Sequence, residues 1–321
     1  MQRVLVILTV ILLVTVSLGV GALTADWPFW RRAWAWHVAD GGWPSALPGP
    51  HAALSGGGGA PLRFEAASAE LAAAAGKART QLLLRARDGQ ADAWFAAPDS
   101  AGHTLIDGRG LTAVVLIALF DVLALKHPGL LDRPVGAFLD ELRQDQRGAL
   151  TPRALLAQVG HGFDAPPART PLNPFSAAAR LVSGPDFREA ALAAFDPVDA
   201  ARGTAPAAAA QLLASVAATV EGENFAAVLE REFWSAAATA DATLPLDRRR
   251  GTAAAHCCLQ AAATDWLRLG LAVAATGAPY DAVRTFTTAG RILVVGASGQ
   301  AVFWAGEGAP PSGLEMLLAG P

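Results

Sequence analysis

Lysine and tyrosine are almost missing from this chain of 321 residues. It contains two lysines, Lys77 and Lys126, and one tyrosine, Tyr280, so chemistry that needs either side chain has few candidates. Charged residues make up only 17% of the chain, the formal net charge is −3 and the mean hydropathy is +0.33. These values exclude a disordered chain and a coiled coil. They also argue against a nucleic-acid partner, which requires clustered positive charge.

Cysteine is equally scarce, because the only two cysteines are the neighbours Cys257 and Cys258. No disulfide framework can be built from them, and adjacent residues rarely meet the geometry for bonding to each other. There is no C-x-x-C pair and no zinc-like spacing of ligands. We therefore predict two small, at least partly buried side chains, with no metal site and no cofactor.

The first long feature that is present is an uncharged run of 20 residues, Val4 to Leu23. As a helix it would span about 30 Å, the hydrocarbon thickness of a bilayer. Residues 1–25 are therefore predicted to be a transmembrane anchor. The small residues Val20, Gly21 and Ala22 leave a cleaved signal peptide open as the alternative.

Tryptophan is concentrated directly after this run. Five of the nine tryptophans are Trp27, Trp30, Trp34, Trp36 and Trp43. On a helix, Trp27, Trp30 and Trp34 share one face, whereas Arg31 and Arg32 point elsewhere. This pattern is typical of an interfacial collar at a membrane surface, although rings that cap a protein core would give the same spacing. The N-terminal position favours a single-pass protein of the inner (cytoplasmic) membrane, with the globular part outside the cytoplasm.

Beyond residue 25 the chain divides into a Trp-rich juxtamembrane segment with a Gly/Pro linker (26–61) and a globular domain (62–321). The predicted strands are Gln81–Arg87, Ala91–Ala96, Arg291–Val295 and Ala301–Ala305. The predicted helices are Glu65–Ala75, Thr112–Ala124, Leu131–Leu142, Thr151–Val159, Ala207–Thr219, Asn224–Phe233 and Leu259–Ala275. Thr112–Ala124 is apolar on nearly all sides, which is typical of a central helix. This order predicts an α+β fold in which both ends of the chain share one sheet.

Three stretches in sequence order resemble one family. The first runs from His103 to Asp164 and contains Thr151-Pro-Arg-Ala-Leu-Leu156; the second runs from Asn224 to Gly270 and ends in Thr264-Asp-Trp-Leu-Arg-Leu-Gly270; the third is Gly296-Ala-Ser-Gly-Gln300. Together they resemble the serine β-lactamase and penicillin-binding-protein-like hydrolases, in the branch of the 6-aminohexanoate-dimer hydrolases. The resemblance covers about residues 62–321. It implies a β-lactamase-like fold, with an antiparallel sheet flanked by helices and a mostly helical region.

The same resemblance locates the positions where the family keeps its catalytic residues. The family's S-x-x-K pair opens the central helix, and counting back from Thr112 places its serine at Ile106 and its lysine at Arg109. The family's tyrosine position falls at Ala205. No S-x-x-K exists anywhere in the chain, because Ala74 precedes Lys77 at −3 and Leu123 precedes Lys126. An arginine stays protonated at any workable pH and cannot replace the lysine as a base.

What remains of the family's site is expected to be a remnant cleft. Its residues would be Asp107, Gly296, Ser298, Gly299 and Gln300. The leading interpretation is a pseudoenzyme with a binding or regulatory role, whose partners are the membrane and an envelope protein or a small ligand in the cleft.

Two alternatives stay open. The first is an active amidase or esterase with a rearranged site, in which Ser298 is the nucleophile and His161 or His256 is the base. The second is a purely structural anchor in which the tryptophans matter most. The pairs His161/Asp164 and His103/Asp107 lack a third partner, so we interpret them as locally hydrogen-bonded or solvated histidines.

Overall fold

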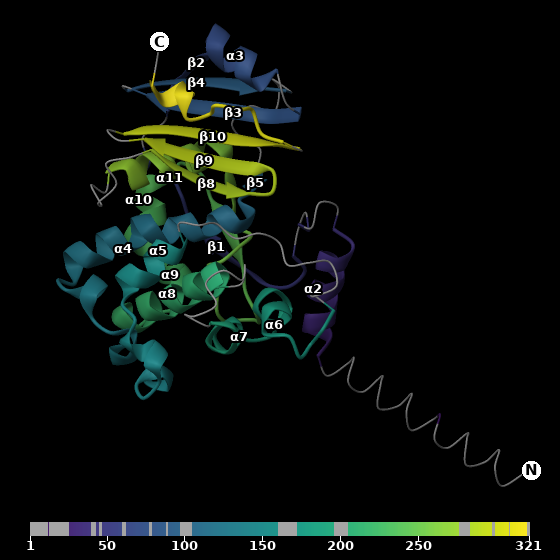
Figure 1. Ribbon diagram of the computed structural model, residues 1–321, viewed down its shortest axis with the longest axis vertical. Coiled ribbons are helices and arrows are strands. Elements are labelled where there is room, and N and C mark those ends of the chain that lie inside the picture. Colours follow the sequence, from purple (N-terminus) through teal and green to yellow (C-terminus); the bar gives the residue numbers. More distant parts are fainter. Residues whose placement is uncertain are drawn as a thin grey trace, which may run out of the picture.

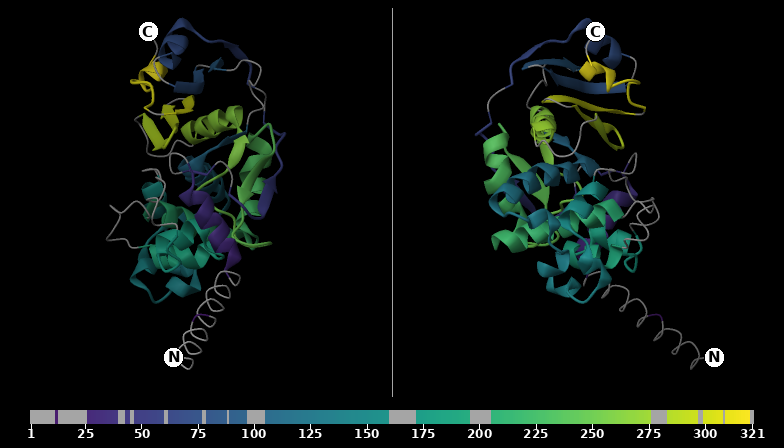
Figure 2. Two further views of the ribbon diagram at one scale, coloured as in Figure 1. Left: turned by 90° about the vertical axis from the view of Figure 1, so that its right-hand side faces the viewer. Right: turned by 60° about the vertical axis from the view of Figure 1, so that its left-hand side comes forward.

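The computed structural model describes residues 12, 26–39, 43–44, 47–59, 62–76, 79–87, 89–96, 105–159, 172–195, 205–275, 283–296, 299–307 and 309–319. These residues form two regions that lie against each other, one built around a six-stranded sheet and one mostly helical (Figures 1 and 2). A smaller sheet of four strands accompanies the helical region.

The larger sheet contains strands from both ends of the chain. Its members are β2 (Phe64–Ala66), β3 (Arg79–Arg87), β4 (Gln90–Phe95), β8 (Arg284–Thr288), β9 (Arg291–Gly296) and β10 (Gln300–Glu307). The order is β2-β4-β3-β10-β9-β8, and every neighbouring pair is antiparallel except β2 with β4. Because β3 pairs with β10, the expectation that the two ends share one sheet is confirmed.

The central strands of this sheet are buried on both faces. In β3, Leu82 and Leu84 belong to the main core, which includes helix α11 (Ala263–Ala275). Leu83 points to the opposite face and packs in a second core with α3 (Ala69–Ala75) and α12 (Met316–Ala319). Side chains alternate across a strand, so burial of both faces explains why the run Leu82–Leu84 is apolar without a break.

The helical region surrounds one buried helix. Its α-helices are α2 (Trp27–His37), α4 (Val115–Lys126), α5 (Pro152–Val159), α6 (Ala177–Ser183), α7 (Phe187–Ala194), α8 (Ala205–Glu221), α9 (Phe225–Leu229) and α10 (Ser235–Ala237). The π-helical turn η9 (Glu230–Trp234) joins α9 to α10. Helix α4 is buried over its first six residues, as expected of a helix that is apolar on nearly all sides. A 3₁₀ turn, η3 (Arg109–Val114), leads directly into α4.

The segment expected to be one helix over Leu131–Leu142 consists of short 3₁₀ turns instead. They are η4 (Leu130–Asp132), η5 (Val135–Ala137) and η6 (Asp140–Leu142), and η7 (Gln146–Ala149) follows them. Pro134 lies between the first two turns, where it removes a backbone donor and disfavours a helical residue before it. The apolar spacing therefore correctly predicted that these residues pack into the core, but the prediction of a continuous helix was wrong.

The smaller sheet corrects two further expectations. Its strands are β1 (His51–Leu54), β5 (Leu105–Asp107), β6 (Ala242–Pro245) and β7 (Gln260–Ala262), in the order β1-β6-β7-β5. Strand β1 lies inside the segment 26–61, in the part that was expected to be a Gly/Pro linker, and it pairs antiparallel with β6. Strand β7 occupies the start of the expected helix Leu259–Ala275, because its backbone pairs with β5. In both places tertiary pairing overrides the local sequence signal.

Helix α2 is attached to the helical region through a buried arginine. The Arg32 guanidinium donates to the carbonyl oxygens of Pro48 (3.2 Å), Gly184 (3.1 Å) and Leu246, and lies over the ring of Phe187. Burial lowers its pKa from the ordinary value, with partial compensation from the charge of Asp247. This side chain joins three separate parts of the chain, which explains how a buried charge is accommodated.

The expected membrane span Val4–Leu23 lies outside the described residues except for Leu12. Among the residues that the structure describes, no single helix has both the length and the apolar character to cross a membrane. Taken together, the helices Pro206–Glu221 and Phe225–Ala237 are long and apolar enough to span a membrane, but the pair is bent by 79°.

Candidate functional site

The central helix begins at Arg109, after strand β5 and the single residue Gly108. Ile106, the position that the resemblance gave for the family's serine, lies inside β5, buried and opposite Ala261. The two side chains that lie three residues apart at the start of the helix are therefore Arg109 and Thr112. This is the spacing at which one helical face would present a nucleophile and a base.

Thr112 carries a hydroxyl at this site, and that hydroxyl is fully engaged. It is buried, donates to the carbonyl oxygen of Arg109 (2.8 Å) and accepts from the amide of Leu259 (2.9 Å). Its proton therefore points at a backbone carbonyl, not at a basic side chain. In this arrangement the Thr112 hydroxyl holds the turn together and is not activated as a nucleophile.

Arg109 adopts an unusual backbone conformation, with φ of +50°. Its amide donates to Oδ1 of Asp107 (2.8 Å), and its guanidinium donates to the carbonyl oxygen of Ala289 in the turn between β8 and β9. A left-handed non-glycine residue is uncommon, and such residues concentrate at functional sites. Burial lowers the pKa of Arg109, against the attraction of Asp107 and Glu307.

The charges of two guanidinium groups, those of Arg109 and Arg291, act on the carboxyl group of Asp107. Burial raises its pKa to about 6, although the hydrogen bond from the Arg109 amide and the charges of Arg109 and Arg291 oppose the rise. Arg291, at the start of β9, donates to the carbonyl oxygens of Asp107 (3.2 Å) and Gly290 (2.6 Å). Burial and the like charge of Arg109 lower the pKa of Arg291 to about 10. Two cations and two carboxyl groups, Asp107 and Glu307, thus act on one another here, and neither cation can act as a general base near neutral pH.

Tight packing fixes the position of the turn before the helix. The indole nitrogen of Trp266 in α11 donates to the carbonyl oxygen of Ile106 (3.1 Å). A Cβ atom on Gly108 would lie 2.0 Å from the same indole ring, so only glycine fits there. Trp266 belongs to the Thr264–Gly270 stretch that carried the family resemblance, and here its role is to support the site.

The two cysteines are joined by a disulfide, which the sequence analysis did not expect. Cys258 has a φ of +73°, a conformation that sequence spacing does not reveal. The amide of Cys258 donates to the carbonyl oxygen of Arg109 (3.2 Å), so the disulfide lies directly beside the start of the central helix. The expectation that both side chains are buried is confirmed.

Of the other residues assigned to the remnant cleft, Gly296, Gly299 and Gln300 do not gather here. Gly296 ends β9 and pairs with Gln300 of β10, whereas Arg291 at the beginning of β9 contacts Asp107. The β9–β10 turn is therefore at the opposite end of the strand from Asp107. Its Gly299 lines a separate hollow of about 310 Å³ together with Leu62, Arg63, Ala86, Arg87, Gly89, Gln90, Ala91 and Leu271.

The remaining candidates lie elsewhere or outside the described residues. Ala205 is the first residue of α8. His256 is fully buried, donates through Nδ1 to Oε1 of Gln211 (3.2 Å) and packs edge-on against Phe187; burial lowers its pKa to about 3. The residues outside the description are Lys77, His103, His161, Asp164, Tyr280 and Ser298. Within the described ranges, no group of three or more His, Cys, Asp or Glu side chains could hold a metal ion.

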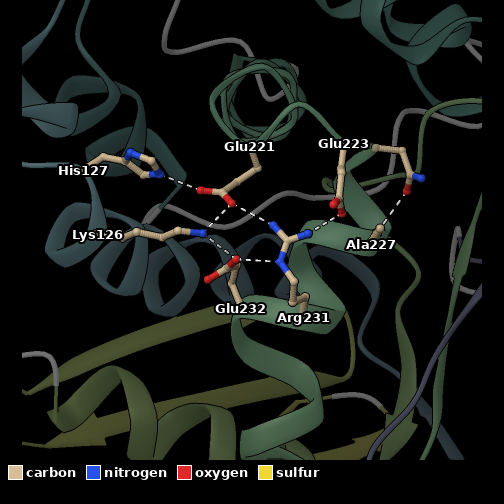
Figure 3. Close-up of polar contacts among 8 residues, drawn as sticks. Lys126, His127, Glu221, Glu223, Ala227, Arg231 and Glu232 are labelled. Carbon is tan, nitrogen blue, oxygen red and sulfur yellow. Dashed lines mark hydrogen bonds and ion pairs between the residues drawn. The ribbon is translucent and has the colours of Figure 1, made fainter.

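Lys126 lies at the far end of α4 from Arg109, in a network of ion pairs (Figure 3). Its ammonium group binds Glu221 (2.6 Å) and Glu232 (2.9 Å), while His127 donates to Glu221 (2.6 Å). Arg231 joins the network through Glu221 (2.7 Å), Glu232 (2.8 Å) and Glu223. Burial alone would raise the pKa of Glu221, but the hydrogen bonds from Lys126 and His127 outweigh it and lower the pKa to about 2. The network ties the ends of α4, α8 and η9 together and does not contribute to the site.

The tryptophans of the predicted collar differ in exposure. Trp27 and Trp34 on α2 are 56% and 59% exposed, whereas Trp30 is half-buried and stacks edge-on with Phe29. Trp36, on the side facing the protein, is buried. The outer side of α2 therefore presents two large indole rings to solvent.

Sequence reasoning missed Thr112, Arg291 and the disulfide as parts of the site. Thr112 could have been found from its three-residue spacing to Arg109, which the sequence shows. Arg291 carries no sequence signal, because β9 brings it to Asp107 from the other end of the chain.

Neither a protein-family model nor a curated protein sequence matches the chain. Solved structures do match. A putative 6-aminohexanoate-dimer hydrolase from Bacillus anthracis superposes with a TM-score of 0.55 and 14% identity, over 83% of this chain and 87% of that one. A class C β-lactamase from Rhodobacter sphaeroides superposes with a TM-score of 0.50 and 15% identity, over 76% and 95%. With its mixed architecture and central buried helix, the chain has the fold of the serine β-lactamase and penicillin-binding-protein-like hydrolases.

Proposed function

We propose that this protein is a membrane-anchored, non-hydrolytic member of its fold class, with a binding or regulatory role in the cell envelope. The observation that carries the proposal is the pair Arg109 and Thr112 at the start of the central helix. A serine-hydrolase mechanism needs a nucleophilic hydroxyl and a group that removes its proton. Here the hydroxyl donates to a carbonyl oxygen and its neighbour is a guanidinium that stays charged.

The preserved fold is compatible with a loss of catalysis. Burial of α4 and α11 stabilises the molecule whether or not a reaction takes place, and a fold by itself does not imply an activity. Arg109 and Arg291 provide two guanidinium groups at the site, while the carboxyl groups of Asp107 and Glu307 oppose their charge. A small ligand at this position would be one that accepts hydrogen bonds from a guanidinium group, and the alternative partner is another envelope protein.

Three features support the membrane location. The uncharged run Val4–Leu23 directly precedes α2, and the exposed rings of Trp27 and Trp34 suit the membrane–water interface. A disulfide persists in oxidising compartments and is rare in the cytoplasm. We therefore place the globular part on the extracytoplasmic side of the cytoplasmic membrane, held there by one span.

Turnover of an activated chromogenic ester tests the loss of catalysis. We expect the purified full-length protein to hydrolyse the ester no faster than buffer, and Ser298→Ala to behave identically. Hydrolysis by the wild type that is absent from Ser298→Ala would establish the rearranged serine site instead. Hydrolysis by both proteins would also overturn the proposal, because it would require another nucleophile.

Extraction from membranes tests the anchor. We expect the full chain to need detergent, whereas a chain lacking residues 1–25 is released by buffer. Recovery of both in the soluble fraction, with an intact N-terminus on the full chain, would contradict the anchor.

A further inference from the structure

The disulfide between Cys257 and Cys258 closes a ring across a single peptide bond. A disulfide restricts the unfolded chain in proportion to the logarithm of the loop it closes, so this one adds little to global stability. Its effect must therefore be local. What lies next to it is the turn that opens the central helix.

Cys258 and Leu259 hold this turn from both sides. The amide of Cys258 donates to the Arg109 carbonyl (3.2 Å), and the amide of Leu259 donates to the Thr112 hydroxyl (2.9 Å). The Leu259 carbonyl in turn accepts from the amide of Gly108 (2.9 Å). These hydrogen bonds couple the backbone of the disulfide ring directly to the backbone of Arg109.

The backbone geometry of the contact is unusual on both partners. Cys258 has a φ of +73° and Arg109 a φ of +50°, and the two residues are hydrogen-bonded to each other. An L-residue with a side chain avoids this region unless its surroundings impose it. The bond to Cys257 is the covalent constraint that acts on Cys258 in this conformation.

The chain before the cysteines is fixed to α8. The buried amide of Gln211 donates to the carbonyl of Ala253 (2.9 Å) and accepts from the amide of Ala255 (3.0 Å) and from Nδ1 of His256 (3.2 Å). When the conformation of the disulfide ring changes, the residues before the cysteines are therefore held in place. We expect the backbone from Cys258 onward to move instead, together with Arg109, which is hydrogen-bonded to it.

We propose that the Cys257–Cys258 disulfide is a redox-controlled clamp that holds Arg109 in its left-handed conformation, with its guanidinium on the Ala289 carbonyl. A dithiol reductant donates two electrons and two protons, the S–S bond breaks into two thiols, and the dithiol becomes a disulfide. Without the bond, Cys258 leaves the positive-φ region, its hydrogen bond to Arg109 is lost and the guanidinium is released. Reoxidation restores the clamp. The proposal concerns the state of the site and does not depend on whether the protein binds a ligand or a partner.

Chemical modification of arginine reads out the clamp in the full-length protein. An arginine-selective dicarbonyl is applied to protein purified without reductant and to the same protein after treatment with a dithiol, and the modified peptides are quantified by mass spectrometry. We expect modification of Arg109 to accelerate at least severalfold on reduction. Modification of Arg143, which is exposed and distant in sequence from the cysteines, serves as the reference and should not change.

Two variants separate the disulfide bond from the backbone conformation that it imposes. Cys257→Ser/Cys258→Ser should react at Arg109 like the reduced protein. Cys257→Ser/Cys258→Gly also lacks the bond, but glycine adopts a positive φ without cost, so it should stay closer to the oxidised protein. Should either variant not fold, the comparison of oxidised and reduced wild type decides alone.

Two results would overturn the proposal. The first is alkylation of both cysteines in the unfolded, never-reduced protein, which would show that the bond is absent. The second is an Arg109 modification rate that is the same in the oxidised protein, the reduced protein and the double serine variant.

Discussion

Replacing Thr112 by valine removes one hydroxyl from the start of the central helix and keeps the shape of the side chain. The amide of Leu259 then loses its acceptor inside the protein, which costs about 1–3 kcal/mol for a buried donor without a partner. Loss of the hydrogen bond to the Arg109 carbonyl adds about 1 kcal/mol, while that carbonyl keeps the amide of Cys258. We expect the free energy of unfolding to fall by about 2–4 kcal/mol.

Urea denaturation followed by tryptophan fluorescence measures this change. Thr112→Ser keeps the hydroxyl and should lose clearly less stability than Thr112→Val. Thr219→Val is the matched control, because the exposed Thr219 hydroxyl only donates to the carbonyl of Ser215 within α8, and it should stay within about 0.5 kcal/mol of the wild type. A Thr112→Val protein as stable as the wild type would refute a structural role for this hydroxyl.

Three further predictions concern buried groups. Arg32→Met should lower the free energy of unfolding by about 3 kcal/mol, because it removes charge-assisted hydrogen bonds to three backbone carbonyls, and thermal denaturation measures the loss. Gly108→Ala should cost about 3 kcal/mol in urea denaturation, since the new methyl group overlaps the ring of Trp266. His256 is buried in its neutral form with a pKa of about 3, below its ordinary 6.5. Its contribution to stability is thus complete above pH 6.5 and is lost as the pH falls towards 3, by up to about 1.4 kcal/mol per pH unit, so His256→Gln should show a flatter profile over this window.

Arg32→Met and Gly108→Ala each have a matched control. Arg31→Met changes an exposed neighbour of Arg32 and should stay within about 0.5 kcal/mol of the wild type. Gly76→Ala places a methyl group 3.4 Å from the nearest carbonyl at an ordinary φ, so it should be neutral or slightly stabilising. A Gly108→Ala protein as stable as Gly76→Ala would contradict the close contact between Trp266 and the turn at Gly108. A pH profile of His256→Gln identical to that of the wild type would contradict the buried neutral histidine.

The large sheet and the central helix could be predicted because local pattern and tertiary environment agree there. The alternation in β3, where Leu83 packs on the opposite face from Leu82 and Leu84, gives an apolar run of the right length for a buried strand. The uniformly apolar stretch from Thr112 onward likewise matches a helix that is buried over its first half.

Short strands held only by their partners could not be predicted. His51–Leu54 is surrounded by Gly and Pro, and Gln260–Ala262 continues into a helix of similar composition. Each is a strand because its backbone groups find partners in β6 or β5, which are distant in sequence. Local propensity contains no information about these pairings.

At the site, the sequence showed that the catalytic S-x-x-K pair is missing, but it did not show how the residues around the start of the central helix are arranged. The lack of any S-x-x-K is a property of the whole chain and needs no alignment. The sequence placed the family's serine position at Ile106, whereas the structure has Ile106 in β5, because the short turn between this strand and the helix has no clear sequence signal. The disulfide was missed because neighbouring cysteines rarely meet the geometry for bonding to each other, and the sequence does not show the positive φ of Cys258.

Covalent labelling tests the central claim most directly. The full-length protein is incubated with a fluorophosphonate and, separately, with a penicillin, and its intact mass is compared with that of an untreated sample. The account predicts no added mass with either reagent, because no described hydroxyl at the start of α4 has a base to remove its proton. Stoichiometric addition of either reagent to one serine or threonine would contradict it.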